Sequence, residues 1–183
     1  MGIFSRLFNA RPTTEKSDQD LSYIAEITKL ISDDDTEVMN KIALCIDDIS
    51  NYAELNSGKY KERGIDINNC DNDTLGWICM IDKLEENGYL FSVDHNCEAV
   101  DLLWALSQIK TYDLIKDAVS ELELDKSKDI EAWAEEINLA ISGALVCMID
   151  IDSDSYELII VSHDVYDKIS VIAQNKGHSI EVF

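Results

Sequence analysis

The sequence has few basic residues and few glycines, and each scarcity argues against a class of function. Its 15 lysines and arginines stand against 37 aspartates and glutamates, for a formal net charge of −22. A nucleic-acid-binding surface needs cations that replace the counterions condensed on phosphates, so we expect no nucleic-acid partner. The seven glycines form no phosphate-cradling loop, and the sequence contains no G-x-G-x-x-G, P-loop or G-x-S-x-G motif.

Long apolar runs and paired cysteines are also missing. No segment reaches the roughly 18 consecutive apolar residues of a membrane-spanning helix. The five cysteines are an odd number, no two of them form a C-x-x-C pair, and three lie within apolar stretches. This usage is typical of reduced, buried thiols, so we expect a cytoplasmic protein without a disulfide framework.

The N-terminal segment differs in charge from the rest of the chain. Residues 1–16 hold three cations and one acid, a charge of +2, and four large apolar side chains lie within residues 3–8. The single proline, Pro12, marks the start of a linker. We expect residues 1–17 to be a mobile amphipathic arm and linker, and residues 18–183 to be a single domain. The arm also predicts a weak contact with anionic membranes through residues 3–8.

The rest of the sequence alternates between helical and extended patterns. Apolar residues recur at helical spacing over 20–31, 36–55, 97–109, 111–126, 129–142 and 164–175. Short apolar runs typical of strands cover 75–81, 89–93, 144–151, 156–162 and 179–183. Asn87-Gly88 lies between the first two runs and favours a hairpin turn, because both residues tolerate positive φ. Within 97–109 the expected inward residues are Val100, Leu103, Trp104 and Leu106.

Two segments of the chain are identical over four residues. Cys79–Asp82 and Cys147–Asp150 both have the sequence Cys-Met-Ile-Asp, and His95 and His163 follow them at the same separation of 68 residues. In each copy the pattern indicates a strand, a turn, a second strand and then a helix. The spacing therefore suggests an internal duplication.

The fold class predicted from this repeat is α+β. We expect an antiparallel sheet built from a duplicated β-hairpin–helix unit, with copies at about residues 75–110 and 143–177, because a lone hairpin is marginally stable. Further helices precede the first copy and are inserted at 111–142. All helices are expected to pack on one face of the sheet.

The repeat units offer carboxylates and imidazoles that could hold a divalent metal ion for hydrolysis. The candidate ligands are Asp82, Asp94, His95, Asp150 and His163. The spacing Asp150-x-Asp152-x-Asp154 resembles the start of a calcium loop. An EF-hand also needs glycine at the sixth position and glutamate at the twelfth, and both are missing here. A loose surface calcium site at these three aspartates is an alternative, although a solvated turn explains the run more simply.

Acidity is the strongest functional feature of the sequence. Carboxylates concentrate at 33–37, 66–73, 117–136 and 150–157. Such a field accelerates association with a basic partner, although a solvated acidic surface can serve solubility alone. The candidate partner-binding residues are Asp33, Asp34, Asp35, Asp71, Asp73, Asp152 and Asp154.

The two Cys-Met-Ile-Asp segments, and the stretch Gly88–Asp94 leading to Val100–Leu106, resemble an uncharacterised bacterial domain family. The chain is also similar in style to small acidic immunity proteins, which cover the cationic active site of a toxin. This resemblance implies a binding role and assigns no functional residue. We therefore expect a non-enzymatic acidic module that binds a basic protein and needs no cofactor. A metal-dependent hydrolase and a membrane-peripheral adaptor are the alternatives.

Overall fold

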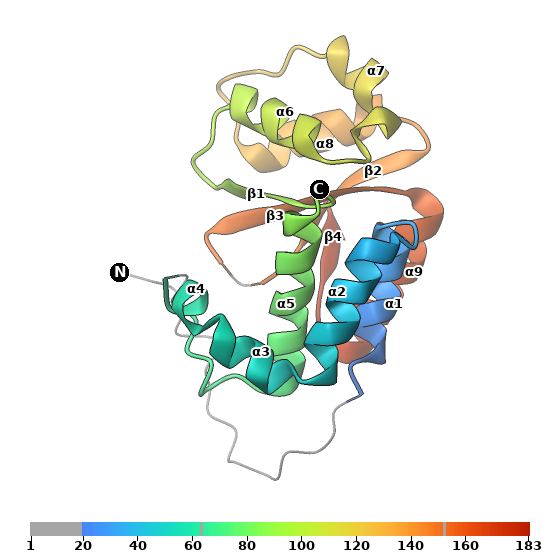
Figure 1. The fold of residues 1–183 in the computed structure, drawn as a ribbon. Coiled ribbons are helices and arrows are strands. Elements are labelled where there is room, and N and C mark those ends of the chain that lie inside the picture. Colours follow the sequence, from blue (N-terminus) through green and yellow to red (C-terminus); the bar gives the residue numbers. More distant parts are fainter. Residues whose placement is uncertain (1–19, 63, 152) are drawn as a thin grey trace.

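A computed structural model describes residues 20–62, 64–151 and 153–183 of the chain (Figure 1). Among these residues the strands are β1 (Phe91–Asp94), β2 (Ala144–Ile149), β3 (Ser155–Ser162) and β4 (Ile180–Val182). The α-helices are α1 (Ser22–Ile31), α2 (Thr36–Asp47), α3 (Ile49–Leu55), α4 (Ser57–Glu62), α5 (Asn72–Glu86), α6 (Ala99–Gln108), α7 (Lys116–Ser120), α8 (Ile130–Ala140) and α9 (His163–Lys176). One short 3-10 helix, η1 (Tyr112–Leu114), precedes α7. The α+β class is therefore confirmed.

The four strands form one antiparallel sheet in the order β1-β3-β2-β4. The long strand β3 lies inside the sheet, and its residues from Glu157 to Val161 are all buried. Strand β4 is short and pairs only with the second half of β2, from Ile180 opposite Ile149 to Val182 opposite Cys147. The strand predicted over 179–183 is thus confirmed, as a short strand at the edge of the sheet.

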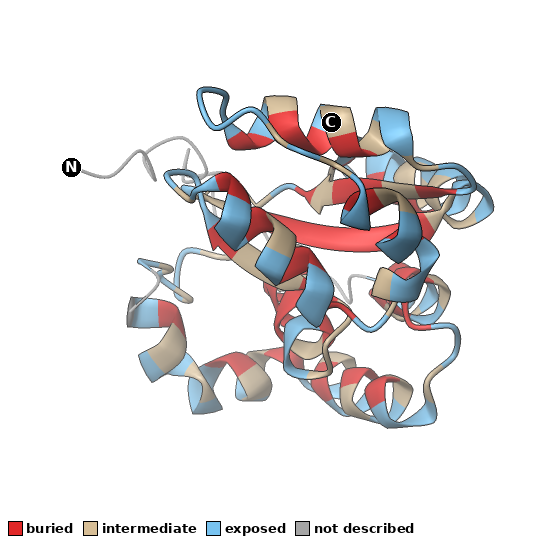
Figure 2. Cartoon of the chain, turned by 90° about the horizontal axis from the view of Figure 1, so that it is seen from above, coloured by how far each residue is buried: buried red, intermediate tan, exposed pale blue. Residues whose placement is uncertain are grey.

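Helices cover both faces of the sheet, so the prediction that they pack on one face is wrong. In Figure 1, α6, α7 and α8 form an upper layer, and α1, α2, α3, α5 and α9 lie below the sheet. The reason lies in the strands, which are apolar on both sides: Leu158 and Ile160 of β3 belong to the upper core, while Ile159 belongs to the lower core. Figure 2 shows the buried residues running along the strand at the centre of the molecule. Strands buried on both faces have continuous apolar runs rather than alternating ones.

Residues 75–81, predicted as a strand, form the middle of helix α5 instead. Nine residues of this helix are buried, including every position from Leu75 to Asp82. A helix buried on all sides has no amphipathic period, and an apolar run alone cannot distinguish it from a buried strand. Residues 75–110 therefore form a helix, a turn, strand β1 and helix α6, and the predicted hairpin of the first repeat copy is wrong.

The Asn87-Gly88 pair ends a helix rather than joining two strands. Asn87 is the C-cap of α5, and Gly88 has φ +74°. A glycine with positive φ immediately after a helix is the usual helix stop. The preference of this pair for positive φ therefore ends a helix here, rather than forming the hairpin turn that we predicted.

Three other helical predictions differ from the structure in part. The pattern over 36–55 forms two helices because Asp48, with φ −143° and ψ 73°, leaves helical geometry and caps α3 by accepting a hydrogen bond from Asn51 N. Helix α6 is confirmed, but two of its expected inward residues face outward, since Val100 is 64% and Trp104 57% exposed. The predicted helix over 111–126 is reduced to η1 and α7.

A side chain continues the hydrogen bonding of β2 beyond the end of β4. The N–H of Val146 donates to Oδ1 of Asn138 on α8 over 2.8 Å, and Asn138 Nδ2 donates to the carbonyl oxygen of Val146 over 2.9 Å. Because β4 ends opposite Cys147, this amide supplies the two bonds that a further strand residue would make.

No helix among the described residues has the length and apolarity needed to cross a membrane. The expected arm, with its membrane-contacting residues 3–8, lies outside the described part of the chain.

Candidate functional site

A groove of about 540 Å³ opens between the start of α8 and the edge strand β4, on the upper face of the sheet. We call it the α8–β4 groove. Its lining residues are Asp129, Glu131, Ala132, Glu135, Met148, Tyr156, Glu181, Val182 and Phe183. The larger apolar side chains among them, those of Met148, Tyr156 and Phe183, are half-buried. They form an apolar floor between carboxylates on two separate elements.

Strand register and helix geometry together place these side chains. Met148 lies opposite Glu181 in the β2–β4 ladder, so the two side chains share one face of the sheet. Phe183, two residues after Glu181, returns to that face. On the other side of the groove, Glu131 and Glu135 are four residues apart and therefore lie on one face of α8. Asp129 caps α8 by accepting a hydrogen bond from Ala132 N over 3.1 Å.

The floor and the rim of the groove are joined by a phenol–carboxylate hydrogen bond. Tyr156 Oη donates to Glu131 Oε1 over 2.9 Å. Burial raises the pKa of Tyr156 to about 12, and the hydrogen bond to Glu131 acts in the same direction. The Tyr156 ring also lies 5.8 Å from that of Phe183, at a tilted angle. At neutral pH the floor therefore keeps a neutral phenol, and the charge of the groove comes from its carboxylates.

A second hollow, of about 300 Å³, adjoins the groove and shares Glu131, Met148 and Tyr156 with it. His95, Asp150 and Asp154 also line this hollow. The backbone N–H of His95 donates to the carbonyl oxygen of Asp154 over 3.3 Å, which ties the end of β1 to the turn before β3. The carboxylates that line the two hollows are those of Asp129, Glu131, Glu135, Asp150, Asp154 and Glu181. Among the described residues that line them, none is a lysine or an arginine.

The candidate metal ligands do not come together as one set. His95 and Asp150 line the second hollow, and Asp94 is exposed beside His95. Asp82 instead lies fully buried in α5 below the sheet, with its Oδ1 2.9 Å from Lys59 Nζ, and His163 is exposed at the start of α9. Within the part of the chain that the structure describes, no three or more His, Cys, Asp or Glu residues form a group that could hold a metal ion.

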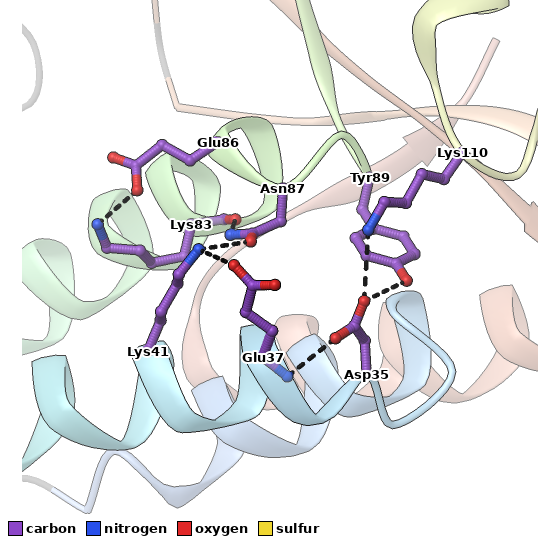
Figure 3. Close-up of polar contacts among 8 residues, drawn as sticks. All are labelled: Asp35, Glu37, Lys41, Lys83, Glu86, Asn87, Tyr89 and Lys110. Atoms are coloured by element: carbon purple, nitrogen blue, oxygen red, sulfur yellow. Dashed lines mark hydrogen bonds and ion pairs between the residues drawn. The ribbon is translucent and has the colours of Figure 1, made fainter.

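The acidic run at residues 33–35 builds a turn and a helix cap. Asp35 caps α2 by accepting a hydrogen bond from Glu37 N, and it also accepts bonds from Tyr89 Oη over 2.9 Å and Lys110 Nζ over 3.3 Å (Figure 3). The bond from Tyr89 holds the pKa of Asp35 below its usual value, with the Glu37 N–H adding to the effect.

The other two carboxylates of this run belong to the turn itself. Asp33 and Asp34 have φ values of 51° and 60°, in the left-handed region that aspartate tolerates better than most residues. Asp34 is also 3.3 Å from Lys29 Nζ. The local role of these three aspartates is therefore structural.

The predicted contact residues near α5 also have structural partners. Asp71 caps α5 by accepting a hydrogen bond from Thr74 N over 2.8 Å. Asp73 accepts a bond from Tyr23 Oη over 2.9 Å and lies 2.9 Å from His178 Nε2. Burial alone would raise the pKa of Asp73, but the bonds with His178 and Tyr23 outweigh it and lower the pKa. Asp152 lies outside the described residues, so Asp154 is the one predicted partner-binding residue placed at the hollows.

The sequence predicted the acidic regions that border the groove but not the residues of its floor or of its β4 rim. Residues 117–136 and 150–157 were predicted as separate acidic patches, and the fold brings part of each to the same place. Glu181 and the two ring-bearing residues of the floor were not predicted. A signal for Glu181 existed, because it alternates with the apolar residues Ile180 and Val182 in a strand pattern. Only the register with β2 reveals which groove it faces.

The fold and the groove define a class: an antiparallel α+β domain with helices on both faces and an acidic groove with an apolar floor at one sheet edge. Residues 24–183 match the family model of DUF6630, a domain of unknown function, and the chain belongs to this family. The match confirms the resemblance to an uncharacterised domain family and includes every residue of the groove. No curated protein and no solved structure matches the chain.

Proposed function

We propose that this domain is a non-enzymatic module that binds a basic, partly apolar segment of a partner protein in the α8–β4 groove. The observation that carries the proposal is the convergence of carboxylates from α8 and β4 around a half-buried floor of Met148, Tyr156 and Phe183. Arginine or lysine heads would pair with the rim carboxylates. Their aliphatic stems and neighbouring apolar side chains would cover the floor.

The net charge of −22 supports a role in which the whole domain attracts its partner. The electrostatic field of an acidic domain increases the rate at which it associates with a cationic surface, and specific contacts then set the lifetime of the complex. Among functions of this kind, the chain best suits an immunity-type inhibitor of a basic toxin or nuclease. Such an inhibitor would act by covering a cationic site and would need no cofactor of its own.

The test is capture of a partner from a lysate of the source cells by three immobilised forms of the chain. The first is the wild type. The second is Glu135→Lys/Glu181→Lys, which reverses charge on both rims of the groove. The third is Glu54→Lys/Glu85→Lys, a control with the same change in net charge at exposed positions of α3 and α5.

We expect the wild type and the control to retain one stoichiometric basic protein at low salt and to release it as salt screens the contact. The groove variant should bind that protein at least about tenfold more weakly, since close charge pairs across interfaces are often worth more than 1.4 kcal/mol. Equal retention by all three forms would rule out the groove as the contact. The absence of any basic protein from all three captures would overturn the proposed function.

A further inference from the structure

The chain itself contains a segment whose chemistry matches the α8–β4 groove. Residues 3–11 include the apolar side chains of Ile3, Phe4, Leu7 and Phe8 and the two cations Arg6 and Arg11. Residues 1–16 carry +2, and because the whole chain carries −22, the remainder carries −24. This segment therefore combines apolar surface with positive charge, as the floor and rim of the groove require of an occupant.

The described chain begins close to the element that forms one wall of the groove. Tyr23, in the first turn of α1, has its Oη 3.1 Å from His178 Nε2, and the two rings are stacked with centroids 6.0 Å apart. His178 comes two residues before β4, which leads directly to Glu181 and Phe183 in the groove. The start of α1 is thus about one short strand away from the groove.

The length of the N-terminal segment is sufficient for this distance. Asp20 lies twelve positions after Phe8, and an extended chain of twelve residues spans about 40 Å. The path from His178 along β4 to Phe183 covers only about 17 Å at the usual rise of a strand. The tether can therefore bring residues 3–11 to the groove without any change in the described fold.

We propose that residues 3–11 occupy the α8–β4 groove of their own chain, with aromatic side chains on the floor and arginines at the rim carboxylates. This inference rests on the proposed function, since it assigns to the same groove an internal occupant that a basic partner has to displace. A tethered segment acts at an effective concentration of about millimolar. The affinity of the partner is therefore reduced by the fraction of chains whose groove is filled.

The first measurement is methyl NMR of the full chain, because Met148 lies on the groove floor while Met80 is fully buried in α5. In Phe4→Ser/Phe8→Ser, the Met148 methyl resonance should move and that of Met80 should stay, since aromatic rings leave the floor. The control, Thr13→Ser/Thr14→Ser, changes residues outside the proposed contact and should move neither. Added to Glu135→Lys/Glu181→Lys, the two phenylalanine changes should have no further effect on Met148.

The second measurement uses a labelled synthetic peptide of residues 1–12 as a probe of the open groove. The full chain with Phe4→Ser/Phe8→Ser should bind this peptide at least about tenfold more tightly than the wild type, because its groove is vacant. An unmoved Met148 resonance, or equal peptide affinity of the two chains, overturns the inference. A Met148 shift that disappears on dilution also overturns it, because the occupant would then come from a second copy.

The failure of this inference and that of the proposed function can be told apart. If Met148 is unaffected while groove-dependent capture of a basic protein succeeds, the groove binds a partner without an internal competitor. If Met148 moves and the peptide binds as expected while no basic protein is captured, the internal contact stands without the proposed partner.

Discussion

The sequence Cys-Met-Ile-Asp occurs twice in this chain, and the two copies have different structures. Residues 79–82 are helical, in the middle of α5, and all four are fully buried. In the second copy, Cys147 to Ile149 end strand β2 and Asp150 follows it exposed. The comparison shows that the environment that buries a short apolar segment selects its secondary structure, whereas the segment itself accepts either.

The flanking residues explain which structure each copy adopts. Helix α5, which contains the helical copy, begins after the cap at Asp71 and includes Gly76, where an added Cβ would lie 3.2 Å from Leu21 Cδ2 of the segment before α1. This close approach allows a helix to pack tightly in the lower layer. Strand β2, which contains most of the extended copy, follows Gly143, with φ +86°, and includes Val146 just before the copy. Positive φ ends the preceding helical region, and β-branched residues favour the strand.

A side chain next to the helical copy contacts the extended copy. Trp77, two residues before the helical copy, donates a hydrogen bond from Nε1 to the carbonyl oxygen of Asp150 over 3.0 Å. Its ring stacks on His178 with centroids 4.1 Å apart. The indole therefore links α5 to the end of β2 and to the start of β4, and changes in one copy should reach the other.

Truncation of the methionine should give the largest difference between the copies. Met80 is fully buried, so Met80→Ala should lower the free energy of unfolding by about 3 kcal/mol, the usual cost of such a cavity. Met148 is half-buried at the groove, and Met148→Ala should cost less than about 1 kcal/mol. Urea unfolding followed by circular dichroism measures both. Equal losses would contradict the difference in burial between Met80 and Met148.

Substitution of the aspartate should give the next largest difference. Asp82 is fully buried and paired with Lys59, whose side chain is 39% exposed. Asp82→Asn should destabilise the protein by about 2 kcal/mol, because it leaves the lysine next to a neutral amide, and the exposure of Lys59 moderates the loss. Asp150→Asn is the matched control at an exposed position and should change stability by less than about 0.5 kcal/mol. A larger loss in the control than in Asp82→Asn would contradict the comparison.

Removal of the indole N–H tests the contact between the copies. Trp77→Phe should cost about 1.5 kcal/mol, since it removes the hydrogen bond to Asp150 and part of the buried ring. Hydrogen exchange at the amides near the end of β2 should become faster. Trp133→Phe is the control, because Trp133 Nε1 donates to the Asp125 carbonyl oxygen in the upper layer. If both variants leave β2 exchange unchanged, the indole does not couple the copies.

Acid should reduce the stability that the Asp73 carboxylate gives to the start of α5, by a smaller amount than the preceding substitutions. The pKa of Asp73, in the first turn of α5, is lowered because bonds with His178 and Tyr23 outweigh the effect of burial. A lowered folded-state pKa gives stability that is present above the unfolded value of about 3.9 and is lost as the pH falls through the folded value. At pH 7 the free energy of unfolding of the wild type should therefore exceed that of Asp73→Asn by less than about 1 kcal/mol.

The same pair of proteins provides the check on the sign of this effect. The difference in stability between wild type and Asp73→Asn should begin to close as the pH falls below about 3.9, where Asp73 is protonated in the unfolded state, and should vanish below the lowered folded-state pKa, where both states are protonated. Urea unfolding at several pH values measures this. A difference that grows as the pH falls would contradict the assigned direction.

Sequence patterns predicted the second half of the fold better than the first half. Helices α8 and α9 and strands β2, β3 and β4 follow visible periods and turn residues, such as Gly143 and Gly177, which have positive φ. Helix α5 could not be predicted because it is buried on nearly every side, which removes the helical period from its sequence. The error then extended to the repeat, since an assumed strand at 75–81 made the two copies appear alike.

The groove was predicted only in part for a different reason. Local composition identified the acidic residues of α8 and of the turn near Asp154, because charge is visible residue by residue. The floor depends on which face of the sheet Met148, Tyr156 and Phe183 share, and that is set by register and by the short length of β4. Such long-range pairing has no local signature in a single sequence.

The amide of Asn138 has a consequence for the behaviour of the folded protein in concentrated solution. Backbone N–H and C=O groups at a sheet edge can pair with a strand from another molecule and so begin aggregation. At Val146 both groups are already bonded to one side chain, so this stretch of edge offers no template to a neighbouring molecule. Although β4 is short and the groove beside it is open, this part of the sheet therefore exposes no unpaired backbone groups at Val146 for another molecule to bind.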